Sequence, residues 1–195
     1  MKRVGLTGGM GCGKSTVVAE FKQLGIPCFV CDQVAAGYYN NPEFLDEVRK
    51  LLGNSVFLPD GNVDKRAVAA RVFSDHSLLE GLNALIHPRV MKDFDVFCEK
   101  HSAAPYALFE SAILYDYGFD RKMDCVVCVY LDLEERLSRL RKRDGVGDNA
   151  LMARIANQIP AEEMMRRADY VILNYEGNPR KRQVAYIDKQ LRTKS

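Results

Sequence analysis

The residues best suited to chemistry lie close to the start of the chain, where residues 8–15 read GGMGCGKS. They match the pattern G-x-x-x-x-G-K-[ST] between an apolar run and a helix-like stretch, which is the context of a phosphate-binding loop. The glycines let backbone N–H groups curl around phosphates, and the N-terminus of the following helix adds partial positive charge. Lys14 is expected to reach the β- and γ-phosphates, and Ser15 to bind Mg²⁺. The predicted nucleotide contacts are Gly8, Gly9, Gly11, Cys12, Gly13, Lys14, Ser15 and Thr16. The alternative is a glycine-rich turn that binds nothing.

A second candidate is Asp32, in the stretch IPCFVCDQ at 26–33. We expect this carboxylate to end the second strand beside the phosphate-binding loop, because ligands of open parallel sheets bind beyond the carboxyl ends of strands. There it can accept the proton of an acceptor hydroxyl or help to orient it. The alternative is a helix-capping aspartate.

Two cysteine pairs have the C-x2-C spacing that forms one half of a four-cysteine zinc site. They are Cys28 with Cys31 and Cys125 with Cys128. Both pairs lie in strand-like runs, where residues three apart point to opposite faces, so neither pair can chelate one metal. We therefore expect reduced thiols packed as small apolar residues.

The third candidate is the basic segment DLEERLSRLRKRD at 132–144. Asp132 with Glu135 predicts a capped helix start, and Leu137 with Leu140 predicts a packed face. Three arginines, Arg136, Arg139 and Arg143, follow at helical spacing and can clamp a phosphoryl group through planar guanidinium contacts. The segment predicts either a lid over phosphates or a solvated charged face.

Five apolar runs supply the elements that must position these residues. They read RVGLTG at 3–8, IPCFVCD at 26–32, YALFES at 106–111, CVVCVYLD at 125–132 and DYVILN at 169–174. Continuous apolar character predicts strands buried on both faces, and therefore an α/β fold with a parallel sheet flanked by helices. Helical patterns at 42–53, 64–75 and 78–101, with a turn at Pro59-Asp60-Gly61, lie between the second and third runs. This segment is longer than a crossover needs, which indicates an acceptor-binding insert.

Composition excludes several other classes. The 195 residues carry 28 Lys and Arg against 26 Asp and Glu, so the net charge of +2 gives no reason to expect a nucleic-acid or membrane partner. No run approaches the ~20 apolar residues of a membrane span and no leader is visible, so a cytoplasmic location is expected.

The basic C-terminal segment predicts an amphipathic helix with Val184, Ile187 and Leu191 packed inward. Oligomeric state is not predicted.

A phosphate-binding loop specifies nucleotide binding and leaves the reaction open. The chain has no N-K-x-D motif of a GTPase, and it is short for a motor ATPase. A small-molecule kinase is the hypothesis that the loop, the carboxylate and the basic segment favour together. Another kinase of this type, acting on nucleoside monophosphates, and a non-catalytic nucleotide-binding protein are the alternatives.

Several blocks in order give the chain a resemblance to the dephospho-CoA kinase family over nearly its whole length. They are GLTGGMGCGKST at 5–16, CDQVAA at 31–36, GNVDKRAVAARVF at 61–73, LNALIHPRV at 82–90, AILYD at 112–116, RLSRLRKRD at 136–144, ARIANQ at 153–158 and ADYVILN at 168–174. The resemblance implies ATP-dependent phosphorylation of the ribose 3′-hydroxyl of dephospho-CoA with Mg²⁺. It implies one kinase domain over 1–195, with a core at 1–33, 104–135 and 168–195, a helical CoA-binding insert at about 34–103 and a lid at about 136–160.

The resemblance also implies roles for single residues. Asp32 matches the base, Arg139 a phosphate-contacting lid arginine, with Arg143 in the same row, and Asn174 a residue near the adenine. Arg66 and His87 match acceptor-binding positions. Family members often have D-A-D where this chain has Val30-Cys31-Asp32, arginine where it has Ala36, and P-L-L-[FY]-E where it has AILYD at 112–116. Asp32 is thus the only carboxylate of its triplet.

Overall fold

The computed structural model describes residues 1–145 and 147–193 and divides the chain into two compact units. Unit 1 comprises Met1–Val30 and the chain from Cys98 onwards, and unit 2 comprises Cys31–Phe97. Among the described residues, no helix combines the length and the apolar character that crossing a bilayer requires.

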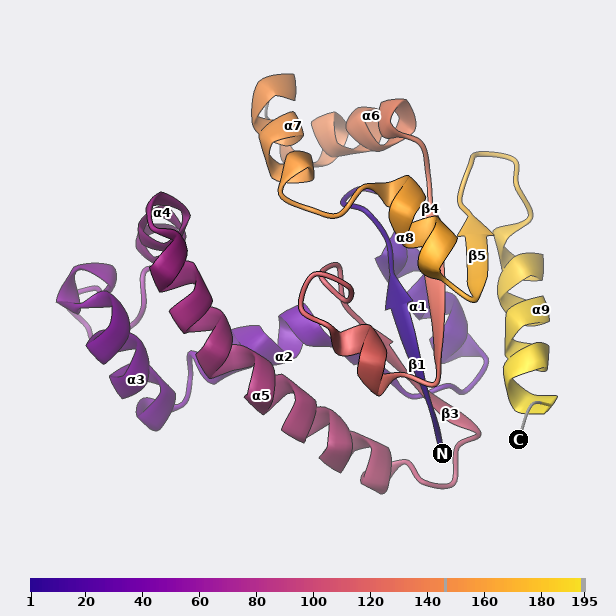
Figure 1. The fold of residues 1–195 in the computed structure, drawn as a ribbon, viewed down its shortest axis with the longest axis horizontal. Coiled ribbons are helices and arrows are strands. Elements are labelled where there is room, and N and C mark those ends of the chain that lie inside the picture. Colours follow the sequence, from indigo (N-terminus) through magenta and orange to yellow (C-terminus); the bar gives the residue numbers. More distant parts are fainter. Residues whose placement is uncertain (146, 194–195) are drawn as a thin grey trace. The chain divides into compact units, whose positions relative to one another are not determined.

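Unit 1 is built on a five-stranded sheet (Figure 1). Its strands are β1 (Lys2–Thr7), β2 (Cys28–Val30), β3 (Tyr106–Glu110), β4 (Cys125–Tyr130) and β5 (Tyr170–Leu173). The strand order is β2-β3-β1-β4-β5 and every neighbouring pair is parallel. All five predicted strands are present, and the predicted α/β fold with a parallel sheet is confirmed. Because β3 lies between β1 and β2, the carboxyl end of β3 is next to the start of the phosphate-binding loop.

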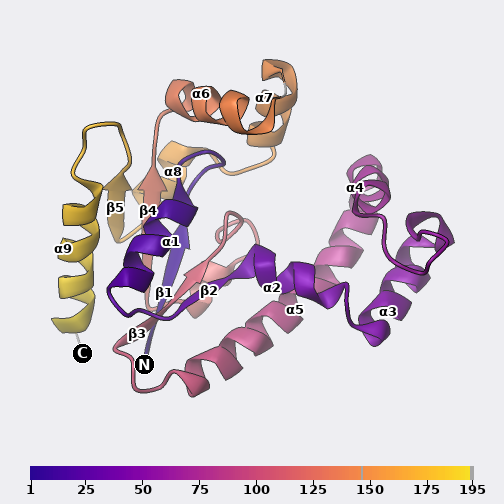
Figure 2. The same cartoon turned by 180° about the vertical axis from the view of Figure 1, so that it is seen from behind.

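Helices cover both faces of this sheet. One face carries α1 (Lys14–Gln23) and α9 (Arg180–Thr193), whose apolar side chains share a core with alternate residues of β1, β3 and β4. Val184, Ile187 and Leu191 are buried in that core, so the predicted inward face of α9 is confirmed. The other face carries α8 (Ala161–Arg167), which contacts β4, and the 3-10 helix η2 (Phe119–Lys122). Figure 1 shows α8 in front of β4, and Figure 2 shows α1 in front of β1.

The basic segment forms α6 (Leu133–Asp144), followed by α7 (Asp148–Ala156). The predicted cap is confirmed, because Asp132 Oδ1 accepts a hydrogen bond from the Glu135 N–H at 3.0 Å. The lid range predicted at 136–160 includes Val146, which lies outside the described residues.

The second strand ends earlier than predicted. β2 stops at Val30, and Cys31 and Asp32 are the first residues of α2 (Cys31–Tyr38). The prediction that Asp32 ends a strand is therefore wrong, as is the placement of Cys31 on one face of that strand. The apolar run continues from the three-residue strand into the helix, so periodicity alone could not locate the boundary. Cys125 and Cys128 do both lie in a strand, β4.

Unit 2 is helical. Its elements are α2, α3 (Pro42–Leu52), the 3-10 helix η1 (Asn54–Val56), α4 (Lys65–Ser74) and most of α5 (His76–Lys100). Asn41 Oδ1 accepts from the Glu43 N–H at 2.8 Å and Asp64 Oδ1 accepts from the Arg66 N–H at 2.8 Å, which caps α3 and α4. The helices share an apolar core of Phe44, Val48, Leu52, Val56, Val68, Val72 and Leu82. The three predicted helices are confirmed, as is the turn at residues 59–61, which the Gly61 N–H closes on Leu58 O at 2.9 Å.

Candidate active site

The phosphate-binding loop connects β1 to α1 and is held open by its glycines. Gly8 has a φ of 146°, and a Cβ there would lie 2.3 Å from Val129 O. Gly13 has a φ of 92°, and a Cβ there would lie 2.2 Å from Asn174 Nδ2. Both positions therefore combine a backbone that favours glycine with a neighbour that leaves no room for a side chain. The sequence pattern and the structure agree on why these two residues are glycine.

Lys14, Ser15 and Thr16 occupy the first turn of α1, directly after the loop. The first N–H groups of a helix lack partners within it, so this turn presents donors and partial positive charge to an anion. Ser15 and Thr16 are exposed. Lys14 Nζ donates to Gly8 O at 2.9 Å, which holds the ammonium over the loop.

The three arginines of α6 go to three different places. Arg136 is 4% exposed and its Nε donates to Met10 O at 2.8 Å, so it packs against the loop backbone. Arg139 Nη2 donates to Asn174 O at 2.8 Å. Arg143 is exposed and pairs with Asp144 at 2.6 Å. Of the three arginines, Arg136 contacts the phosphate-binding loop and Arg139 contacts its neighbour Asn174. Arg143 instead pairs with the next residue in the sequence.

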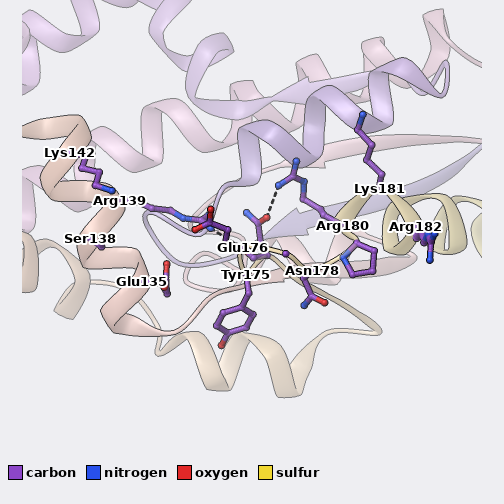
Figure 3. A pocket seen from close by; sticks show the side chains of 13 residues that line it. Glu135, Ser138, Arg139, Lys142, Tyr175, Glu176, Asn178, Arg180, Lys181 and Arg182 are labelled. Atoms are coloured by element: carbon purple, nitrogen blue, oxygen red, sulfur yellow. Dashed lines mark hydrogen bonds between the residues drawn. The ribbon is translucent and has the colours of Figure 1, made fainter.

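A pocket of about 620 Å³ opens between α6 and the chain that connects β5 to α9. It is lined by Glu135, Ser138, Arg139, Lys142, Asn174, Tyr175, Glu176, Gly177, Asn178, Pro179, Arg180, Lys181 and Arg182. Basic side chains outnumber acidic ones in this lining, which suits a polyanionic ligand. Figure 3 shows Arg139 and Arg180 reaching into the pocket from opposite sides.

Asn174 joins the pocket to the phosphate-binding loop. It is 1% exposed, and its Nδ2 donates to Cys12 O at 2.7 Å. Its Oδ1 accepts from Arg180 Nη1 at 2.8 Å, and Arg180 also contacts Glu20 Oε1 at 2.9 Å. Asn174 lines the pocket, but both ends of its amide are occupied by protein partners. Its side chain therefore fixes the loop and Arg180.

The sequence prediction did not include Arg180, which it treated as part of a basic tail. Only the fold brings the start of α9 back to Asn174 and α1, so no local pattern could have shown this contact. Glu110 was also missed, although a carboxylate that closes an apolar run is a visible signal.

Glu110 is the last residue of β3, is 7% exposed and is paired in register with Leu6 of β1. Burial raises the pKa of the Cys12 thiol, and the charge of Glu110 contributes to that rise. Because Leu6 lies two residues before Gly8, the pairing of Glu110 with Leu6 places Glu110 at the end of the sheet where the phosphate-binding loop begins. Glu110 and Ser15 are candidate oxygen ligands for a cation at this end of the sheet.

The remaining predicted site residues belong to unit 2. Asp32 and Arg66 are exposed, and His87 is half-buried in α5, where burial lowers its pKa. Tyr38 donates to Asp93 Oδ2 at 2.6 Å and packs its ring against Phe44. The side chains of Asp32, Arg66 and His87 are thus at least partly accessible to a ligand.

All six cysteines are free thiols. Burial raises the pKa of Cys28 and of Cys128 to about 12. Among the residues that the structure describes, no group of three or more His, Cys, Asp or Glu side chains is arranged to hold a metal.

Comparison with known proteins identifies relatives of the whole chain. A family model described as dephospho-CoA kinase matches residues 2–179. The dephospho-CoA kinase of Corynebacterium glutamicum is 36% identical over 177 residues, which cover 89% of this chain and 88% of that protein. The crystal structure of TT1252 from Thermus thermophilus has a TM-score of 0.85 and 32% identity, covering 100% of this chain and 98% of that one. Dephospho-CoA kinase from Campylobacter jejuni shares the fold, with a TM-score of 0.70 at 21% identity and 98% coverage of each chain.

Proposed function

The chain belongs to the dephospho-CoA kinase family, and we propose that its residues carry out the reaction of that family. This reaction is the final step of coenzyme A biosynthesis. It transfers the γ-phosphoryl group of ATP to the ribose 3′-hydroxyl of dephospho-CoA and gives coenzyme A and ADP. The observation that supports it best is that the phosphate-binding loop, Arg139 and a basic pocket are joined through Asn174 in unit 1.

The nucleotide binds in unit 1. The phosphates lie against the loop and the first turn of α1, where Lys14 exchanges Gly8 O for phosphate oxygens. Arg139 neutralises charge on the transferring phosphoryl group from the opposite side. The base and ribose occupy the pocket between α6 and the β5–α9 connection, which extends from Arg139 to Arg180.

The residues present fit Mg²⁺. A serine hydroxyl and a buried carboxylate are hard oxygen ligands, and Mg²⁺ sites in proteins use one or two such groups with phosphate oxygens and water. Ser15 and Glu110 would hold the ion. An ion held there would supply positive charge that stabilises the phosphates of ATP.

The acceptor binds to the helical insert at about 34–103, with Arg66 and His87 as contact residues. Asp32 accepts the proton of the ribose 3′-hydroxyl as the phosphoryl group arrives. It is exposed, and it follows β2 by two positions, so it is carried by the helix that begins at the carboxyl end of that strand. Asp32 accepts this proton without a second aspartate in its triplet, since the chain has Val30 where family members often have another aspartate.

An acceptor panel tests the proposal. ADP release is coupled to a spectrophotometric signal with dephospho-CoA, AMP, CMP or shikimate as the second substrate. We expect turnover with dephospho-CoA and background rates with the other three. Turnover with a nucleoside monophosphate alone would refute the proposed substrate, and ATP binding without turnover of any acceptor would indicate a non-catalytic nucleotide-binding protein.

A further inference from the structure

The residue Met10 lies in the middle of the phosphate-binding loop, and side chains from distant segments hold both polar groups of its backbone. Its N–H donates to Gln158 Oε1 at 2.9 Å, and its carbonyl accepts from Arg136 Nε at 2.8 Å. These partners are 148 and 126 positions away in the sequence. The loop turn at Met10 is therefore fixed by the chain that follows β4.

Gln158 is itself placed by contacts on either side of it. Its backbone N–H donates to Ile155 O at 3.0 Å, and the next residue, Ile159, donates to Asp116 Oδ1 at 3.4 Å. After Pro160, α8 begins and packs on β4 through buried Ala161 and Met164. The backbone of Gln158 is thus tied to the sheet, and its half-buried side chain reaches back to the loop.

Arg136 adds a second constraint at the same point. Its guanidinium lies where a Cβ on Gly9 would be, at 2.6 Å from the guanidinium carbon. Substituting Gly9 would therefore displace Arg136 from Met10. The loop, α6 and the α7–α8 connection form one hydrogen-bonded group around a single residue.

We propose that Gln158 is a positioning residue of the phosphate-binding loop: its Oε1 fixes the Met10 N–H and so holds the loop in the shape that binds phosphate. Only an acceptor can satisfy a backbone N–H, so the contacting atom is the amide oxygen. The α7–α8 connection thereby contributes to nucleotide affinity without touching the nucleotide. This inference rests on the proposed nucleotide-binding function of the loop.

Two substitutions separate the acceptor from the bulk of the side chain. Gln158→Met keeps the length but removes the oxygen, and Gln158→Glu keeps an oxygen acceptor. Amide hydrogen exchange at Met10 is measured by NMR in the ligand-free protein, together with the dissociation constant for ADP. Asn157→Ala, at the exposed neighbouring position, is the matched control, and melting temperatures report on folding.

We expect Gln158→Met to raise the rate of amide exchange at Met10 about 5-fold and to raise the dissociation constant for ADP about 5-fold. This is the scale of losing one neutral hydrogen bond. In Gln158→Glu, exchange at Met10 should stay as slow as in the wild type. ADP affinity is not compared for this variant, because its charge repels phosphate. Unchanged exchange in Gln158→Met, or equally fast exchange in both variants, would overturn the proposal. Both readouts omit the acceptor, so they are independent of which hydroxyl the wild type phosphorylates.

Discussion

Replacing Asn174 tests whether one buried amide holds the nucleotide site together. Asn174→Ala removes the bond from Nδ2 to Cys12 O and the bond from Arg180 Nη1 to Oδ1, at 2.7 and 2.8 Å. A neutral hydrogen bond contributes about 1 kcal/mol and one to a charged group about 1.5–3 kcal/mol. Arg180 keeps Glu20 as a partner, so its charge is not left alone and the lower part of that range applies. The expected loss is about 3 kcal/mol, or roughly 6–12 °C in melting temperature for a chain of this size.

The assay is calorimetric melting with and without ADP, and titration of ADP into the folded protein. Asn157→Ala is the matched control, because Asn157 is exposed and is not among the residues that line the pocket. Asn174→Asp separates the two bonds, since it keeps an acceptor for Arg180 but sets an oxygen against Cys12 O. Its added charge also repels phosphate, so weaker ADP binding alone does not test the bond, and we expect the melting temperature of the ligand-free protein to fall as well. If Asn174→Asp binds ADP as tightly as the wild type, the bond to Cys12 does not hold the loop and the reasoning fails.

Three other predictions concern catalysis, metal and pH. Asp32→Asn should keep ADP affinity but lower kcat by at least ~10²-fold, the scale of losing a positioned base, and an unchanged kcat would remove Asp32 from that role. Glu110→Gln should raise the Mg²⁺ concentration for half-maximal activity about 10-fold and reduce the thermal shift given by Mg²⁺ with ADP; no change in either would exclude Glu110 as a ligand. Burial lowers the pKa of His87, so the unfolded chain takes up a proton first and stability falls as the pH drops below about 6.5. His87→Gln should flatten that fall in urea unfolding, whereas His76→Gln, at an exposed site, should not.

The fold could be predicted wherever the burial of an element leaves a pattern of apolar residues in the sequence. The strands of this parallel sheet are buried on both faces, so each appeared as a continuous apolar run, and the cap Asp132 marked a helix start. The boundary between β2 and α2 could not be located in this way, because Cys31 is buried in the helix as it would be in a strand. Asp32 was consequently assigned to the wrong element.

From spacing alone, the candidate site could be predicted only where its residues are close in the sequence, whereas Arg139 and Asn174 were named from the family resemblance. The loop from Gly8 to Ser15 is one such segment, and its glycines are explained by local backbone and by Val129 and Asn174. Glu110 closes an apolar run, but its place beside the loop became known only from the strand order, which puts β3 next to β1. Helical spacing grouped Arg136 with Arg139 and Arg143, but spacing cannot tell which members of a row are buried.

The burial of the cysteines has a further chemical consequence. Coenzyme A carries a thiol, and its disulfide forms exchange with protein cysteines only through the thiolate anion. Burial raises the pKa of Cys28 and of Cys128 to about 12, so these side chains are thiols and not thiolates at neutral pH. The pKa of Cys12, inside the phosphate-binding loop, is raised as well. Burial thus disfavours the Cys12 thiolate, which is the form that would attack a disulfide of coenzyme A, release a coenzyme A thiolate and leave a mixed disulfide on the protein.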